Sequence, residues 1–108
     1  MFYTYVLSSL KDKKFYTGYT SDIEKRLQSH NNGEVFSTKN RRPLRLIYFE
    51  ACLNQEDAIH REKYLKTTYG KRFIKNRLNH FLSEEAITQG ICGSPGNGIQ
   101  KSRNTLRT

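Results

Sequence analysis

Two polar side chains of this sequence fall on an otherwise apolar side of one helical segment. Arg26 and His30 are four residues apart and share or border the face that Ile23 and Leu27 define. An arginine so placed offers a planar fork of donors to phosphate oxygens, and histidine is the usual acid-base group near neutral pH. The structural alternatives are an Arg26 that reaches solvent and pairs with Glu62, and a His30 that is a satisfied core residue.

Glu62 is a carboxylate within another apolar helix face. At about 100 degrees per residue it lies in the stripe that Ala58, Leu65 and Tyr69 form. A glutamate in such a stripe is seldom buried without a partner. Two interpretations are open: an ion pair with an inward arginine such as Arg77, or a ligand for a hard divalent cation such as Mg²⁺, which needs only one or two carboxylates.

Tyr5 and Tyr16 lie in two segments that favour β-strands, so their hydroxyls converge if the strands pair in a suitable register. A phenol titrates near pH 10 and serves as a general base only where a nearby cation, such as Arg26 or a metal ion, favours its charged form. Tyrosine is also a common strand residue, and packing is the plain alternative. Gly18 allows a close approach of the backbone.

Together, Tyr3-Thr4-Tyr5, Tyr16-Thr17-Gly18, Arg26 and Glu62 resemble the GIY-YIG nuclease superfamily, over roughly residues 1 to 82. The small stand-alone bacterial members are the most similar, through the stretches FYTGYT, RPLRLIYFEA and REKYLKT. The sequence departs from the motifs at Tyr3, Thr4 and Thr17, but both motif tyrosines are present.

The resemblance implies a metal-dependent endonuclease that hydrolyses DNA phosphodiester bonds, structure-selective in DNA repair or processing. It makes Glu62 the ligand of Mg²⁺ or Mn²⁺, Arg26 the group that stabilises charge on the phosphate, and Tyr5 and Tyr16 the residues that activate and position water, in an order left open. His30 is an auxiliary acid-base group. Gly18 and a late asparagine support the site; Asn76 is preferred, with Asn79 as the alternative.

Composition favours a nucleic-acid partner, because 19 Lys and Arg against 10 Asp and Glu give a formal charge of +9. Residues 1–83 hold 16 of the basic and 8 of the acidic residues. DNA is the expected ligand and RNA the alternative, although scattered lysines also serve solubility. The expected phosphate contacts are Lys39, Arg41, Arg42, Lys71, Arg72 and Lys75.

The elements that must position these residues follow the order strand, strand, helix, strand, helix, helix. Aromatic and β-branched residues predict a hairpin of strands 2–8 and 14–20, and Leu44 to Leu53 predicts a third strand. Helices are predicted over 22–31, capped by Ser21 with Glu24, over 55–69, capped by Asn54 and ended by Gly70, and over 71–82. With the resemblance, this order predicts an α/β fold, a three-stranded and largely antiparallel sheet flanked by helices.

Residues 1–83 are expected to form one domain, and 84–108, interrupted by glycines and Pro95, a flexible tail. Cys52 and Cys92 lack metal-ligand spacing and are expected to be free thiols. The sequence has no apolar run long enough to span a membrane and no basic-then-apolar leader, so a cytoplasmic protein is expected.

Two rivals to an enzyme are open. One is a nucleic-acid-binding module that kept the fold and cuts nothing, which the complete set of Tyr5, Tyr16, Arg26 and Glu62 disfavours. The other is a basic structural protein associated with RNA, which explains the charge but not an inward glutamate.

Overall fold

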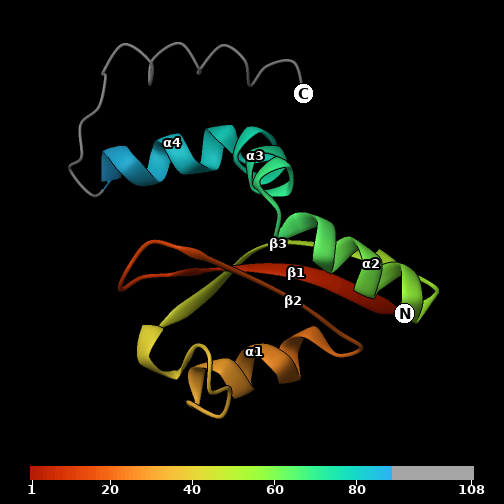
Figure 1. Cartoon of the computed structure of the whole chain (residues 1–108). Coiled ribbons are helices and arrows are strands. Elements are labelled where there is room, and N and C mark those ends of the chain that lie inside the picture. The colour runs from red at the N-terminus through yellow and green to blue at the C-terminus, as the bar shows by residue number, and fades with distance from the viewer. Residues whose placement is uncertain (89–108) are drawn as a thin grey trace. The chain divides into compact units, whose positions relative to one another are not determined.

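The computed structural model describes residues 1–88, which divide into a unit of residues 1–70 and a second unit that begins at Lys71. The first unit is built on an antiparallel sheet of order β2-β1-β3, with β1 at Phe2–Ser9, β2 at Phe15–Thr20 and β3 at Leu44–Cys52. Helices α1 (Ile23–Asn31) and α2 (Gln55–Leu65) cover its two faces, α1 below and α2 above in Figure 1. The predicted fold class is confirmed.

The central position of β1 follows from its composition. Residues 4–7, Thr-Tyr-Val-Leu, are all buried, because this strand has a neighbour on each edge and a helix on each face. Alternation sends Tyr5 and Leu7 toward α1, where they pack with Ile23 and Leu27, and sends Thr4 toward α2. The Thr4 hydroxyl donates a hydrogen bond to the carbonyl of Ala58 on α2, at 3.0 Å.

Helix α1 begins at a different cap from the predicted one. The side chain of Asp22, rather than Ser21, accepts a hydrogen bond from the Lys25 amide at 3.1 Å. Both residues are common caps, and the backbone is extended at Asp22 (φ −144°), as an N-cap requires. The predicted end of the helix is confirmed, because Gly33 adopts a left-handed φ of 79° and its amide donates to the His30 carbonyl.

The segment between α1 and β3 is basic and tied to the sheet at both ends. It contains a single 3₁₀ turn, η1 (Lys39–Arg41). The Asn31 side chain donates to the Leu44 carbonyl and accepts from the Leu44 amide, at 2.9 and 2.8 Å. The Ser9 hydroxyl donates to the Arg41 carbonyl at 2.7 Å. These three hydrogen bonds hold the segment between α1 and β3 in place, although it contains little regular secondary structure.

The helices after β3 differ from the prediction in their boundaries. Asn54 caps α2 as expected, accepting from the amides of Glu56 and Asp57, but α2 ends at Leu65. Gly70 ends no helix: it lies inside α3 (Thr68–Arg77), and its amide donates to the Thr67 hydroxyl. A Cβ at Gly70 would collide with the backbone of Tyr64 and Leu65, so the glycine serves close packing.

In the second unit, the predicted helix over 71–82 is divided between the end of α3 and α4 (Asn79–Thr88). The Leu78 amide still donates to the Ile74 carbonyl across the break. Residues 84–88 of the predicted tail are therefore helical, and residues 89–108, with Cys92, lie outside the described residues. Cys52 is a free thiol. Among residues 1–88, no helix has the length and apolar character needed to cross a membrane.

Candidate active site

The site is built around the hydroxyl of Tyr5 in the middle of β1. Tyr5 pairs with Gly18 of β2, and its side chain is buried, with 2% of the residue exposed. A Cβ on Gly18 would lie only 2.5 Å from Tyr5 Oη and 2.7 Å from Cζ. The ring of Tyr5 therefore crosses β2 at the one position where the strand has no side chain, as the sequence suggested for Gly18.

Helix α1 brings two polar groups to that hydroxyl. Arg26 Nε donates to Tyr5 Oη at 3.3 Å, and His30 Nε2 lies 2.9 Å from the same oxygen. The two residues are one helical turn apart, and the packing of Ile23 and Leu27 on the sheet turns them inward. The helical spacing therefore predicted which residues of α1 face the sheet.

His30 is held from its other side by a residue that sequence reasoning missed. His30 Nδ1 lies 2.8 Å from the hydroxyl of Thr38, and both residues are fully buried. Thr38 comes just before η1 in an irregular segment, so it shares no periodic face with the other site residues. A buried threonine among exposed basic residues gives no signal in one sequence. Four groups thus form a chain: Thr38, His30, Tyr5 and Arg26.

Tyr16 completes the cluster on the α1 side of the sheet. It is half-buried, and its ring centroid lies 5.0 Å from that of His30 and 6.5 Å from that of Tyr5. Tyr16 also helps to raise the pKa of Arg26. Both motif tyrosines therefore surround the same arginine and histidine.

Burial and the arginine set the proton affinities in this cluster. Burial raises the pKa of Tyr5, and the hydrogen bond and charge of Arg26 oppose that rise without cancelling it. Burial, with the nearby charge of Arg26, lowers the pKa of His30 to about 4. The hydrogen bond to Tyr5 raises the pKa of Arg26. At neutral pH the cluster therefore holds a protonated tyrosine, a neutral imidazole and a guanidinium.

Glu62 lies on α2, on the opposite face of the sheet from α1 (Figure 1). Its side chain is 17% exposed, and its Oε2 forms an ion pair of 2.9 Å with Lys66 Nζ, one turn further along α2. Arg26, one of the two arginines considered from the sequence, is therefore not its ion-pair partner within the first unit. Arg77, the other, belongs to the second unit. Its charge still acts on Tyr5, whose pKa it helps to raise. Tyr69, expected in the same stripe, lies on α3 and is exposed.

A metal ion at Glu62 would have few protein ligands. Within residues 1–88, no three His, Cys, Asp or Glu side chains gather in a way that could hold a metal. A single carboxylate nevertheless suits Mg²⁺ or Mn²⁺, which fill their other positions with water and phosphate oxygens. The Lys66 side chain that pairs with this carboxylate is 54% exposed, and the oxygen donor of Glu62 fits a weakly held hard cation.

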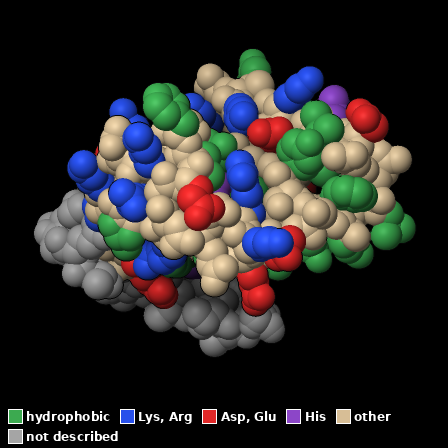
Figure 2. All heavy atoms as spheres, turned by 90° about the horizontal axis from the view of Figure 1, so that it is seen from below, with side chains coloured by type: hydrophobic (Ala, Val, Ile, Leu, Met, Phe, Trp, Pro, Cys, Tyr) green, Lys and Arg blue, Asp and Glu red, His purple; other side chains and the backbone are tan. Residues whose placement is uncertain are grey.

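The basic residues expected at the nucleic acid fall into two groups. In the first unit, Lys39 and Arg42 are exposed, whereas Arg41 is engaged: its Nε binds Asp12 at 3.0 Å and its Nη2 donates to carbonyls of the hairpin turn. In the second unit, the three expected basic residues Lys71, Arg72 and Lys75 lie on α3 and are exposed, as is Asn76, which was expected to support the site. Figure 2, which views the molecule from the α1 side, shows Lys and Arg side chains spread over much of that face, with Asp and Glu between them.

The chain is similar to several known proteins. Residues 1–81 match the family model described as the GIY-YIG catalytic domain. A UPF0213 protein of Clostridium perfringens is 37% identical over 90 residues, which cover 82% of this chain and 90% of that protein. A UPF0213 protein of Pediococcus pentosaceus is 46% identical over 88 residues, covering 81% and 86%. The solution NMR structure of a UPF0213 protein from Bacillus halodurans has 32% identity and a TM-score of 0.44, over 70% of this chain and 84% of that one.

Proposed function

The chain belongs to the GIY-YIG family of nuclease domains, and from this premise we propose that it is a metal-dependent endonuclease that hydrolyses DNA phosphodiester bonds. The observation that supports the proposal most is the Tyr5 hydroxyl held between Arg26 and His30. Two polar side chains, the buried His30 and the half-buried Arg26, converge on one buried oxygen, and only the hydrogen bonds among the three groups offset the water that they give up. Burial of the same groups would be harder to explain in a module that only binds nucleic acid.

Tyr5 is the better of the two tyrosines for taking a proton from the attacking water. The raised pKa of Tyr5 disfavours a free phenolate. Tyr5 would therefore accept the proton of the water only while it donates its own hydroxyl proton to a hydrogen-bonded neighbour. His30 Nε2, 2.9 Å away and neutral at physiological pH, is the acceptor in reach. In this scheme Tyr16 positions the water, and Thr38 holds the imidazole through Nδ1.

Arg26 is placed to meet the phosphate. Its Nε is used by Tyr5, which leaves the terminal nitrogens of the guanidinium to donate to the non-bridging oxygens. Those oxygens gain charge as water attacks, so a fixed cation beside them stabilises the transition state more than the bound ground state.

Glu62 is the residue that would hold the divalent cation, Mg²⁺ or Mn²⁺. When bound, such an ion supplies positive charge to the scissile phosphate and the leaving oxygen. Lys66 forms an ion pair with this carboxylate in the structure. Exposed basic side chains would contact the phosphate backbone: Lys39 and Arg42 in the first unit, and Lys71, Arg72 and Lys75 in the second. Asn76 would support the site.

We propose further that the enzyme selects DNA by its structure and acts in DNA repair or processing in the cytoplasm. RNA is the alternative substrate.

The experiment that tests the activity compares the Glu62→Gln variant with the wild-type protein in Mg²⁺ and in Mn²⁺. The variant should melt at the same temperature and bind the same oligonucleotides, yet lose cleavage by at least a hundredfold, since metal stabilisation amounts to several kcal/mol.

The matched control is Glu56→Gln, which removes an exposed carboxylate from the first turn of the same helix. It should cleave like the wild type. Equal cleavage by all three proteins would refute a metal site at Glu62, and equal loss in both variants would point to a general effect of charge on α2.

A further inference from the structure

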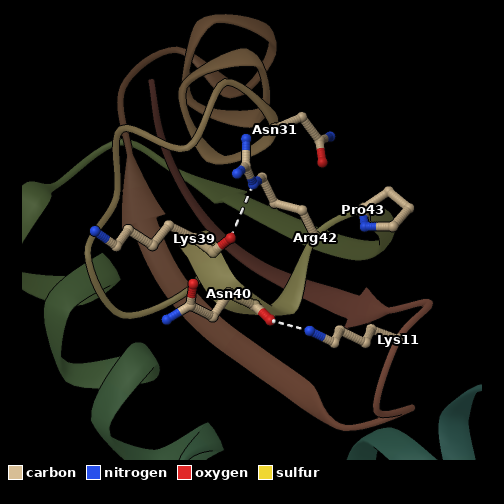
Figure 3. Close-up of a pocket in the computed structure, with 6 residues that line it drawn as sticks. All are labelled: Lys11, Asn31, Lys39, Asn40, Arg42 and Pro43. Carbon is tan, nitrogen blue, oxygen red and sulfur yellow. Dashed lines mark hydrogen bonds between the residues drawn. The ribbon is translucent and has the colours of Figure 1, made fainter.

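A shallow basic depression lies beside the far end of α1, outside the cluster around Tyr5. It has a volume of about 510 Å³. None of its lining residues is acidic; they are Lys11, Asn31, Lys39, Asn40, Arg42 and Pro43. In Figure 3 the Arg42 guanidinium lies beside the Asn31 side chain, and the Lys11 ammonium lies at the other side of the depression. The hairpin turn and the segment before β3 thus combine to make one cationic surface.

The cations are positioned by backbone groups, and none of them is neutralised there. Arg42 Nε donates to the Lys39 carbonyl at 2.8 Å, and Lys11 Nζ donates to the Asn40 carbonyl at 3.2 Å. A Cβ on Gly33 would lie 2.7 Å from Arg42 Nη1, so the guanidinium rests on a residue without a side chain. The remaining protons of both groups face solvent, where they can meet the oxygens of a phosphate.

An exposed aromatic ring adjoins this surface. Phe36 is 84% exposed, the highest value among the large apolar residues of the described chain. The Lys39 side chain leads away from the depression in Figure 3, and its ammonium lies 5.4 Å from the centre of the Phe36 ring. One exposed apolar residue alone means little. Here the ring lies beside the ammonium of Lys39, a residue that also lines the depression, and one ammonium cannot cover both faces of the ring.

We propose that the Phe36 ring and the Lys11–Arg42 depression together bind unpaired nucleotides of a single strand, the ring stacking on a base and the cations holding a neighbouring phosphate. A ring beside a cationic groove is how proteins bind single strands, since every base has a π-face. A duplex hides those faces inside the helix, so the ring discriminates against paired bases. This rests on the proposed function only in taking nucleic acid as the ligand.

The proposed single-strand site lies close along the chain to the cluster around Tyr5. Phe36 is two residues from Thr38, whose hydroxyl holds His30, so their Cα atoms are at most about 7 Å apart. The amides of Thr38 and Lys39 both donate to the Val35 carbonyl, at 3.1 and 3.0 Å, which holds Phe36 on a tight turn. A single strand bound at Phe36 would therefore lie close to the residues proposed to cut it. The substrate would then have an unpaired segment next to the scissile bond.

The chain contains no tryptophan, so Phe36→Trp gives a protein whose only indole is the probe. The full chain with this change is titrated, in EDTA, with a ten-nucleotide oligothymidylate, the matching oligouridylate and a blunt duplex. Stacking quenches the indole, and we expect quenching by the single strands and little by the duplex. A response to the deoxy or to the ribo oligomer alone still supports the site and identifies the sugar it takes. Leu53→Trp, at a position that is 83% exposed before α2, is the control and should not be quenched.

Two further variants separate stacking from charge. Phe36→Leu keeps an apolar side chain but loses the ring, and should weaken single-strand binding about tenfold. Lys11→Gln with Arg42→Gln should lower the slope of log affinity against log salt by about 0.7 for each lost contact on a single strand. Absence of quenching by both single strands, or equal quenching by duplex, overturns the proposal. EDTA prevents metal-dependent cleavage during the titration, so cleavage is measured separately in Mg²⁺ and Mn²⁺. Quenching in EDTA with no cleavage in either metal would refute the proposed function alone. Cleavage in a metal with no quenching in EDTA would refute this site alone.

Discussion

At the scale of single residues, the hydroxyl of Tyr5 is the point where the polar groups of the cluster converge. One oxygen receives a hydrogen bond from Arg26 and contacts a neutral imidazole, which is in turn held by Thr38. Burial dominates the proton affinities, raising the pKa of Tyr5 and lowering that of His30. These opposite shifts keep the proton on the tyrosine until an anion or a metal changes the balance, which suits a relay that acts only with substrate bound.

The role given to Arg26 predicts that Arg26→Ala acts on rate far more than on affinity. Losing a cation aimed at the transition state should reduce single-turnover cleavage by roughly 10² to 10³-fold, whereas one lost phosphate contact changes the dissociation constant by less than tenfold. Lys25→Ala, an exposed neighbour on α1, should alter neither by much. Equal losses of rate and affinity in Arg26→Ala would show that this arginine only clamps the phosphate.

His30 predicts a specific loss of stability in mild acid. Its pKa is about 4 when folded and 6.5 for the exposed group, so the unfolded chain binds more protons between these values. The free energy of unfolding should therefore fall as pH falls from 6.5 to 4, by a total on the order of 3 kcal/mol. Urea titrations at pH 7 and pH 4.5 measure this difference.

In His30→Gln most of that pH dependence should vanish. The carboxyls with lowered pKa values, Asp12 and Glu50, weaken the fold only at more acid pH, because their unfolded values are 3.8 and 4.5. Unchanged stability of the wild type between pH 7 and pH 4.5 would mean that His30 is solvated and that the relay is drawn wrongly.

At the scale of elements, the register of the hairpin decides where the tyrosine points. Tyr5 is opposite Gly18, and Leu7 is opposite Tyr16, so residues that face α1 alternate with residues that face α2. A shift of β2 by one residue would send Tyr16 to the other face of the sheet, away from Tyr5. Helix α1 then supplies Arg26 and His30 only because its apolar residues pack on the same face.

Gly18→Ala tests this arrangement. The new Cβ would lie 2.5 Å from Tyr5 Oη, so the ring must move and its bonds to Arg26 and His30 must break. We expect a loss of about 1–3 kcal/mol in stability from overpacking and a large loss of cleavage, both measured on the same preparation. Ser21→Ala, exposed just after β2, is the control. Wild-type melting and activity in Gly18→Ala would show that the tyrosine lies elsewhere in solution.

The strands, helix α1 and the side of α1 that faces the sheet could be predicted, because each depends on a local sequence pattern. Alternating aromatic residues predict β1 and β2, and the spacing of Ile23, Leu27 and His30 identifies the buried side of α1. The prediction was wrong where several local signals compete. Gly70 resembles a helix stop, yet the backbone of α2 packs so closely against it that only glycine fits inside α3.

Other features could not be predicted because they depend on contacts between distant segments. Thr38 meets His30 only after the irregular segment folds back on α1, and Arg41 meets Asp12 only when the hairpin turn and η1 come together. The cation surface of Lys11 and Arg42 arises in the same way. No periodicity in one sequence records such pairs.

At the scale of the whole molecule, the chain combines a first unit that holds the cluster with a second unit rich in exposed basic residues. A formal charge of +9 attracts any polyanion, and its effect on binding should fall steeply with added salt. In the proposed function, charge would supply general affinity and the buried cluster would supply the chemistry.

The placement of every site residue before Arg77 predicts that a chain ending at Thr88, the last residue of α4, keeps its function. The sequence beyond it has only Ile91, Ile99 and Leu106 as large aliphatic residues, so its removal takes away little apolar surface. The shortened protein should melt within a few degrees of the full chain and cleave the same substrates. A large fall in melting temperature would show that the missing segment packs on the domain.

The most direct test of the account is whether the purified full chain cuts nucleic acid at all. End-labelled single strands, duplexes and duplexes with unpaired tails are incubated with it in Mg²⁺, in Mn²⁺ and in EDTA. We predict cleavage in either metal, strongest next to an unpaired segment, and none in EDTA. Intact substrates in both metals, or cleavage that persists in EDTA, would contradict a metal-dependent site built on Tyr5, Arg26 and Glu62.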